Sequence, residues 1–172
     1  MPVEVLPWIE YRWSFDFPVA MFAAIRERLR GTPARIEELL RGVAPAAAQK
    51  RPAAEKWSPQ EHAGHLTVVE RLWRVRLTEY LRGSSELTAA DMANRATKGE
   101  DFNARELDGI LTSFRASRLE LLASLDVLTL ADAARTAHHP RLDVPMRLVD
   151  LCLFAAEHDD HHLAAIHVLV RA

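Results

Sequence analysis

Apolar residues recur along this chain at steps of three and four in four long stretches, which is the spacing of one face of an α-helix. The stretches predict helices near residues 18–41, 58–82, 104–125 and 146–170. Residues 1–17 lack this period and predict an irregular lead that carries Trp8 and Trp13. Apolar and polar residues never alternate over a useful length, so the sequence predicts no strands. Four long amphipathic helices predict an all-α chain folded as a four-helix up-down bundle, in one domain over residues 1–172.

Short polar motifs predict where the helices begin. Ser58-Pro59-Gln60-Glu61 combines an N-cap serine, a proline at the first helical position and a glutamate at the third, which together form a capping box. Three further pairs have the same spacing, namely Thr88-x-x-Asp91, Thr129-x-x-Asp132 and Asn103-x-x-Glu106. The segment Gly31-Thr32-Pro33 predicts a break or kink in the first helix, and residues 138–145 predict a loop before the last.

Composition and charge narrow the class of protein. With 49% apolar and 27% charged residues, the chain is too hydrophobic to be disordered. Its 22 basic and 24 acidic residues give a net charge of −2, without the basic excess that nucleic-acid binding needs. No stretch approaches the ~20 apolar residues of a membrane span, and Glu4 and Glu10 interrupt the apolar run that a signal peptide requires. We therefore expect a cytoplasmic protein that binds neither nucleic acid nor membrane.

The eight histidines are concentrated in three places along the chain. His158 and His162 lie four residues apart in the last helix, so they share one face, and that face is the apolar stripe assigned to the core. Burying two imidazoles without partners costs about 1–3 kcal/mol each. Contacts with each other, hydroxyl groups or buried water could satisfy them, and so could a metal ion. A metal would need a third ligand from a facing helix, for which His65 is the leading candidate at the edge of the second helix's buried stripe.

Two segments, KWSPQEHAGHLTVVERLW (56–73) and MRLVDLCLFAAEHDDHHLAAIHVL (146–169), resemble the two signature helices of the DinB-like superfamily of small bacterial four-helix proteins. In that family, one histidine of the second helix and an H-x-x-x-H pair of the last helix bind a divalent metal. The matching positions are His65, His158 and His162. The resemblance implies a homodimer, and the family name, from damage-inducible genes, implies a bacterial stress role. Family members resemble metal-dependent hydrolases or thiol S-transferases that use a low-molecular-weight thiol.

The other histidines near these positions have simpler interpretations. His62 follows the Ser58 cap by four residues and is expected to pack on Trp57 as part of the helix start, so it is not counted as a ligand. His161 and His167 lie off the apolar stripe and are expected in solvent.

Residues outside the three-histidine set are weighed in the same way. His138 and His139 are expected to serve a turn, with a place at the mouth of the site as the alternative. Asp159 and Asp160 are expected to be solvated acids, with a hydrogen bond to an imidazole as the alternative. Cys152, the single cysteine, cannot form an internal disulfide and is expected in the core.

These residues predict a metalloenzyme but leave its reaction open. The chain has no G-x-S-x-G elbow, Gly-rich phosphate loop or H-E-x-x-H motif, so a zincin-type protease is excluded. Three imidazoles would hold zinc or nickel, with iron or manganese as alternatives, and would activate either water, as in a hydrolase, or a small thiol, as in a transferase. The substrate would be a small molecule. The alternative is a non-catalytic, dimeric, helical metal-binding protein of the stress response. A structural zinc normally has four protein ligands, so three favour catalysis.

Overall fold

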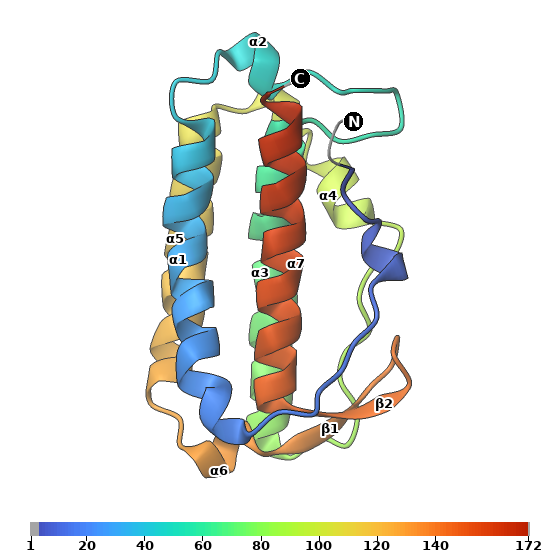
Figure 1. The fold of residues 1–172 in the computed structure, drawn as a ribbon, viewed down its shortest axis with the longest axis vertical. Coiled ribbons are helices and arrows are strands. Elements are labelled where there is room, and N and C mark those ends of the chain that lie inside the picture. Colours follow the sequence, from blue (N-terminus) through green and yellow to red (C-terminus); the bar gives the residue numbers. More distant parts are fainter. Residues whose placement is uncertain (1–3, 172) are drawn as a thin grey trace.

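Four long α-helices run side by side along the length of the protein in a computed structural model that describes residues 4–171 (Figure 1). The long helices are α1 (Phe22–Leu40), α3 (Pro59–Arg82), α5 (Leu107–Asp126) and α7 (Leu148–Leu169). The shorter elements are α2 (Pro45–Ala48), α4 (Arg95–Gly99), α6 (Leu130–Ala133), β1 (Thr136–His139), β2 (Val144–Arg147) and 3-10 turns at Trp8–Glu10, Val19–Met21 and Phe102–Ala104. The all-α four-helix bundle is confirmed, with each long helix within about one turn of its predicted bounds.

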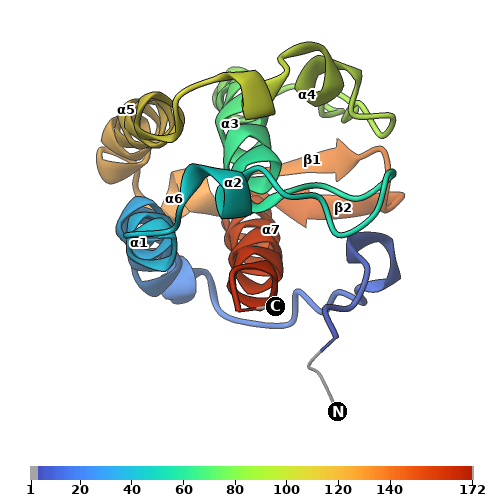
Figure 2. The same cartoon turned by 90° about the horizontal axis from the view of Figure 1, so that it is seen from above.

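The connections determine the directions of the long helices. Seen from above, the order around the bundle is α1, α7, α3 and α5, and each helix packs on its two neighbours (Figure 2). Helices α1 and α7 run one way along the bundle, and α3 and α5 run the other (Figure 1). Residues 83–106 return along the outside of α3 before α5 begins, so α3 and α5 are parallel. The bundle therefore does not alternate direction strictly from one helix to the next.

A small antiparallel hairpin of β1 and β2 lies below α7, where the sequence predicted a loop and no strands (Figure 1). Each strand has only four residues, which is too short for an alternating pattern to show. The hairpin is held by tertiary contacts. The His138 N–H donates to the Ser85 carbonyl at 2.8 Å, and the Leu87 N–H donates to the His138 carbonyl at 3.0 Å. Strand formation here depends on a distant segment rather than on local propensity.

The capping predictions are half confirmed. Ser58 and Thr129 each form a complete capping box at the start of α3 and α6. The Thr88 prediction is wrong, because its N–H and hydroxyl both donate to the Glu79 carboxylate. The Asp91 carboxylate instead accepts hydrogen bonds from the backbone N–H groups that begin α4. A side chain four residues before the first residue of the helix therefore supplies the cap.

Two further predictions of helix boundaries are corrected by long-range contacts. Asn103 does not cap α5, and its side-chain oxygen accepts a hydrogen bond from the Ser58 hydroxyl at 2.7 Å. Helix α1 runs unbroken through Pro33, although proline removes one backbone N–H. The Leu29 carbonyl, which that N–H would have reached, accepts a hydrogen bond from Arg118 Nη1 at 2.9 Å instead. The arginine satisfies the acceptor and the helix continues.

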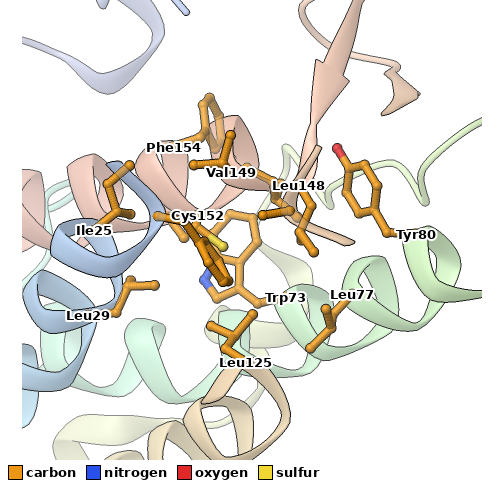
Figure 3. Packing of buried hydrophobic residues seen from close by; sticks show 14 of the residues in the cluster. Ile25, Leu29, Trp73, Leu77, Tyr80, Leu125, Leu148, Val149, Cys152 and Phe154 are labelled. Atoms are coloured by element: carbon orange, nitrogen blue, oxygen red, sulfur yellow. The ribbon is translucent and has the colours of Figure 1, made fainter. Parts of the chain in front are cut away.

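The apolar core fills the bundle between the four long helices. Trp73 and Leu77 of α3 pack against Leu148 and Cys152 of α7, with α1 and α5 closing the cluster (Figure 3). Cys152 is buried, as predicted.

Over residues 4–171, no helix is long and apolar enough to cross a membrane.

Gly64 brings the returning segment close to the middle of α3. A Cβ atom at this position would lie 2.2 Å from the ring of Phe102, so no larger residue fits without movement. The close approach seats residues 95–104 against the face of α3 that carries His65.

Candidate metal centre

Three buried histidines meet between α3 and α7. His65 comes from α3, and His158 and His162 come from successive turns of α7. The Nε2 atom of His158 lies 3.3 Å from Nε2 of His65 and 3.2 Å from Nε2 of His162. The structure therefore brings together the three residues that the sequence predicted as ligands.

The helix geometry explains this convergence. Residues four apart on a helix lie one above the other, which places both α7 imidazoles on the side that faces α3. Helices α3 and α7 are antiparallel neighbours in the bundle. The three rings replace apolar side chains at one level of the core, and each is at most 7% exposed.

The two distances from His158 Nε2 to the other Nε2 atoms fit a shared divalent ion. Two ligand nitrogens, each about 2.1 Å from one ion, lie about 3.0–3.4 Å apart at the angles of octahedral or tetrahedral coordination. Burial lowers the pKa of His65 to about 3 and the pKa values of His158 and His162 well below the ordinary 6.5. The rings are therefore neutral and have lone pairs to offer.

Hydrogen bonds among the three rings leave part of the hydrogen-bonding capacity of their nitrogens unused. A neutral imidazole has one N–H, so His158 Nε2 either donates to one neighbour or accepts from both. Its Nδ1 atom is buried with no hydrogen-bond partner. The outer nitrogens of the other two rings have partners, because His65 Nδ1 lies 2.9 Å from Thr97 Oγ1 and His162 Nδ1 lies 2.8 Å from His62 Nδ1. With protons on those outer nitrogens, the inner lone pairs face one another, which a cation would stabilise.

His62 has a larger role than the sequence indicated. Its ring packs on Trp57, with centroids 5.4 Å apart, as predicted for the helix start. It also contacts the cluster through His162, although it is not part of the group of three converging donors. If His162 offers Nε2 inward, its Nδ1–H donates to His62, whose own proton then sits on Nε2. His62 thus orients a candidate ligand.

A cavity of about 530 Å³ opens beside the three histidines. Its walls include the aromatic rings of Trp8, Trp57, Trp73 and Phe154. Trp8 belongs to the irregular lead, and its ring meets His158 edge-on with centroids 5.1 Å apart. Sequence reasoning missed this residue, since no periodic pattern relates the lead to α7.

Two predictions about the remaining histidines are corrected. His161 is half-buried rather than solvated, because it packs against Trp8 and Tyr11 of the lead. His139 lies in β1, is only 1% exposed and lines the cavity, so it takes the alternative place at the site rather than serving a turn. His167 is exposed, as predicted.

The acids beside the ligand pair do not orient an imidazole. Asp159 is fully buried and pairs with Arg118 at 2.6 Å, whereas the sequence indicated a solvated acid. Arg118 also pairs with Glu70, and all three side chains are at most 1% exposed. Asp160 lies nearer the surface and pairs with two arginines of α1. The signal for the buried network was present, since Arg118 and Glu70 fall in register with the apolar stripes of α5 and α3.

Comparisons with known proteins agree with this architecture. A family model for the DinB superfamily matches residues 28–166. Among solved structures, the chain is similar to YfiT from Bacillus subtilis, a probable metal-dependent hydrolase with an unusual four-helix bundle topology. The two share 18% sequence identity with a TM-score of 0.79, over 94% of this chain and 93% of that chain. At this identity the likeness establishes the fold. No match is found among curated protein sequences.

Proposed function

The chain belongs to the DinB superfamily, and from this premise we propose that it is a metal-dependent hydrolase of small molecules. His65, His158 and His162 would hold one divalent ion through Nε2. The observation that carries the proposal is the convergence of these three atoms at the base of an aromatic cavity. The similarity to YfiT, a probable metal-dependent hydrolase, supports it.

The number of ligands favours a reactive site over a structural one. Within residues 4–171, the converging group contains three ligand side chains and no fourth. Structural zinc sites are normally closed by four protein ligands, whereas catalytic sites hold the ion with three and leave a position for water or substrate. The adjoining cavity provides room for that substrate.

An ion held at this site would lower the pKa of a water molecule towards about 7 and so supply a nucleophile at neutral pH. The chain's own residues would prepare the site in two ways. Thr97 and His62 fix the orientation of His65 and His162 through their outer nitrogens. The rings of Trp8 and Trp57 shield the cluster from bulk water.

A thiol transferase is the second candidate, and one observation limits how it could work. Cys152 is the chain's single cysteine, and burial raises the pKa of its thiol to about 12. It is 4% exposed in the core, so it cannot serve as the nucleophile. A transferase reaction would therefore require a low-molecular-weight thiol from solution.

The imidazole set is compatible with several metals. Zinc and nickel suit neutral imidazoles, and iron or manganese would bind when they are more available.

We also propose a homodimer, because the resemblance to the DinB-like family implies one. Sedimentation velocity over a wide concentration range tests it, and a monomer at every concentration would contradict it.

Elemental analysis of tag-free protein tests the metal site. We expect about one divalent ion per chain in the wild type and almost none in His158→Ala. His167→Ala is the matched control, because His167 lies exposed on the same helix and should retain the ion. Equal metal content in the two variants would overturn the proposal.

Activity measurements separate the two reactions. A hydrolase should cleave ester, amide or lactone substrates without added thiol and should lose this activity with a chelator. Thiol-dependent consumption of an electrophile, with no hydrolysis in its absence, would favour the transferase. Hydrolysis that survives both chelation and His158→Ala would exclude a metal-dependent mechanism.

A further inference from the structure

One side of the cavity carries guanidinium groups that form no ion pair with the described residues. This cationic wall consists of Arg76 of α3, His139 of β1 and Arg141 of the hairpin turn, and all three line the cavity. None of the ion pairs formed by residues 4–171 includes Arg76 or Arg141. Buried guanidinium groups normally have carboxylate partners, because an unpaired charge is costly to remove from water.

Arg76 is buried with part of its hydrogen-bonding capacity unused. The residue is only 1% exposed. Its Nε donates a hydrogen bond to the Thr88 carbonyl at 2.9 Å, whereas its Nη2 is buried and has no hydrogen-bond partner. Arg118 is equally buried but pairs with Glu70 and Asp159. The core of this protein therefore supplies acids to one buried arginine and not to the other.

His139 lies against Arg76 and brings no negative charge to the wall. A neutral imidazole has one acceptor nitrogen, which accepts a hydrogen bond either from the Leu142 N–H, 3.2 Å from Nδ1, or from Arg76 Nη1, 3.1 Å from Nε2. Burial lowers the pKa of His139 to about 4, with Arg76 and Arg141 adding to the effect, so the ring is neutral. In either tautomer, the ring leaves the charge of Arg76 without an anionic partner.

Arg141 presents its charge to the cavity from the hairpin turn. Its guanidinium carbon lies 5.7 Å from the ring centre of Trp8 and 5.3 Å from that of Phe154. The residue is half-buried, and its guanidinium forms no hydrogen bond with any part of the chain that the structure describes. Stacking on aromatic rings holds the side chain in place and leaves its five N–H donors free.

The acids around this wall are already committed elsewhere. Glu79 acts on Arg76 through its charge, but its carboxylate accepts hydrogen bonds from Thr88. Asp91 also lines the cavity, but its carboxylate accepts the backbone N–H groups of Ala93, Arg95 and Ala96 at the start of α4. The acids named here therefore leave the charge of the wall available to a negatively charged ligand in the cavity.

We propose that the cavity binds a small molecule with a carboxylate group, which Arg141 holds against the wall formed with Arg76 and His139. The apolar body of the molecule lies between the tryptophan rings and extends towards the three histidines. The planar guanidinium fork of Arg141 matches the two oxygens of a carboxylate. As a description of the substrate, this inference rests on the proposed hydrolase function, whereas the binding itself does not require the metal.

Benzoate and benzamide test the charge requirement, since they have the same shape and differ in charge. Binding to the metal-free, full-length protein is measured by ligand-observed NMR titration. We expect benzoate to bind at least about tenfold more tightly than benzamide, a difference of about 1.4 kcal/mol. Equal affinities, or no benzoate binding at concentrations of tens of millimolar, would overturn the proposal.

Arginine variants locate the binding site. Arg141→Gln should abolish the preference for benzoate, while Arg41→Gln should retain it, because Arg41 is an exposed residue at the end of α1 that pairs with Glu38. Arg76→Gln should also weaken benzoate binding, provided that its thermal melt shows a folded protein. A benzoate preference that survives Arg141→Gln would contradict the assignment, whatever the fate of the Arg76 variant.

Two further arms separate the possible meanings of a positive result. A benzoate preference in a protein that binds no metal would support the carboxylate site and reject the proposed function. Mercaptosuccinate and succinate differ by one thiol group. Comparing their affinities then shows whether the bound carboxylate belongs to a thiol cosubstrate or to the other substrate. Tighter binding of mercaptosuccinate, found only in the metal-loaded protein, would assign the carboxylate to a thiol, whereas equal binding would assign it to the other substrate.

Discussion

The imidazoles of His62 and His65 lie where burial disfavours their charged forms. Burial lowers the pKa of His62 to about 4 and that of His65 to about 3, whereas both titrate near 6.5 in the unfolded chain. As the pH falls below about 6.5, the unfolded state binds protons that the folded state does not. The free energy of unfolding of the metal-free protein should therefore fall between pH 6.5 and pH 4.

Urea denaturation at several pH values checks this acid sensitivity. The stability should be nearly constant from pH 8 to pH 7 and should decline below that range. His65→Leu should show a smaller decline because it removes one of the groups responsible, and His167→Ala should behave as the wild type. Stability that is unchanged or increased between pH 6.5 and pH 5 would contradict the neutral, buried state of the cluster.

Two histidine variants distinguish a proposed ligand, His65, from a residue that orients a ligand, His62. His65→Ala should eliminate measurable metal binding. His62→Ala should weaken it by about 10–100-fold, because the partner that orients His162 is lost while all three ligands remain. Competition with a chelator of known affinity measures both effects. An unchanged affinity in His62→Ala would show that the contact between the two Nδ1 atoms does not contribute.

The three converging histidines were predictable from the sequence, but the rest of the site was not. The helical period placed His158 and His162 on one buried face and His65 at the edge of the buried stripe of the second helix, and the family resemblance gave the same three residues. The cationic wall could not be predicted, because Arg76 and Arg141 lie far apart in the sequence and meet only through the hairpin. Residues on separate irregular segments carry no common period.

Among the elements, α3 depends on close packing against the segment that returns to α5. Gly64→Ala should destabilise the protein by about 1–3 kcal/mol, since its Cβ would lie 2.2 Å from the ring of Phe102. Gly31→Ala in α1 is the control, because its new Cβ would approach nothing closer than 3.9 Å and alanine favours helix by about 0.5–1 kcal/mol. Thermal melts should show opposite shifts, and a neutral Gly64→Ala would contradict the docking.

Helix α5 is tied to the core through one buried arginine. Arg118→Met should cost about 3–5 kcal/mol of stability, because it leaves the carboxylates of Glu70 and Asp159 buried without their partner. Arg115→Met on the same helix should cost less than about 1 kcal/mol, since its pair with Glu37 is partly solvated. Urea denaturation of both variants makes the comparison, and equal losses would be inconsistent with the buried network.

The element boundaries show why local signals have limits. The capping boxes at Ser58 and Thr129 were predictable because both partners lie within one turn. The continuity of α1 through Pro33 was not, since the acceptor that proline leaves is satisfied by Arg118 from α5. The hairpin was missed for a similar reason, because its partner is the segment after α3.

At the scale of the whole molecule, the bundle was predictable and its directions were not. Four amphipathic stripes require four packed helices. The parallel arrangement of α3 and α5 depends on the path of residues 83–106, which have no apolar period of their own. That path also brings Thr97 to His65, while the lead brings Trp8 to His158. The long helices thus supply the three histidines, and the irregular segments supply residues that contact them.

X-ray absorption spectroscopy at the zinc edge tests most directly whether His65, His158 and His162 hold one ion. The sample is tag-free protein with one equivalent of zinc. We predict three imidazole nitrogens at about 2.0–2.1 Å, with oxygen in the remaining position, and two imidazoles at most in His158→Ala. A spectrum with fewer than three imidazoles in the wild type, a fourth imidazole closing the shell, or no change in the variant would contradict the three-histidine site.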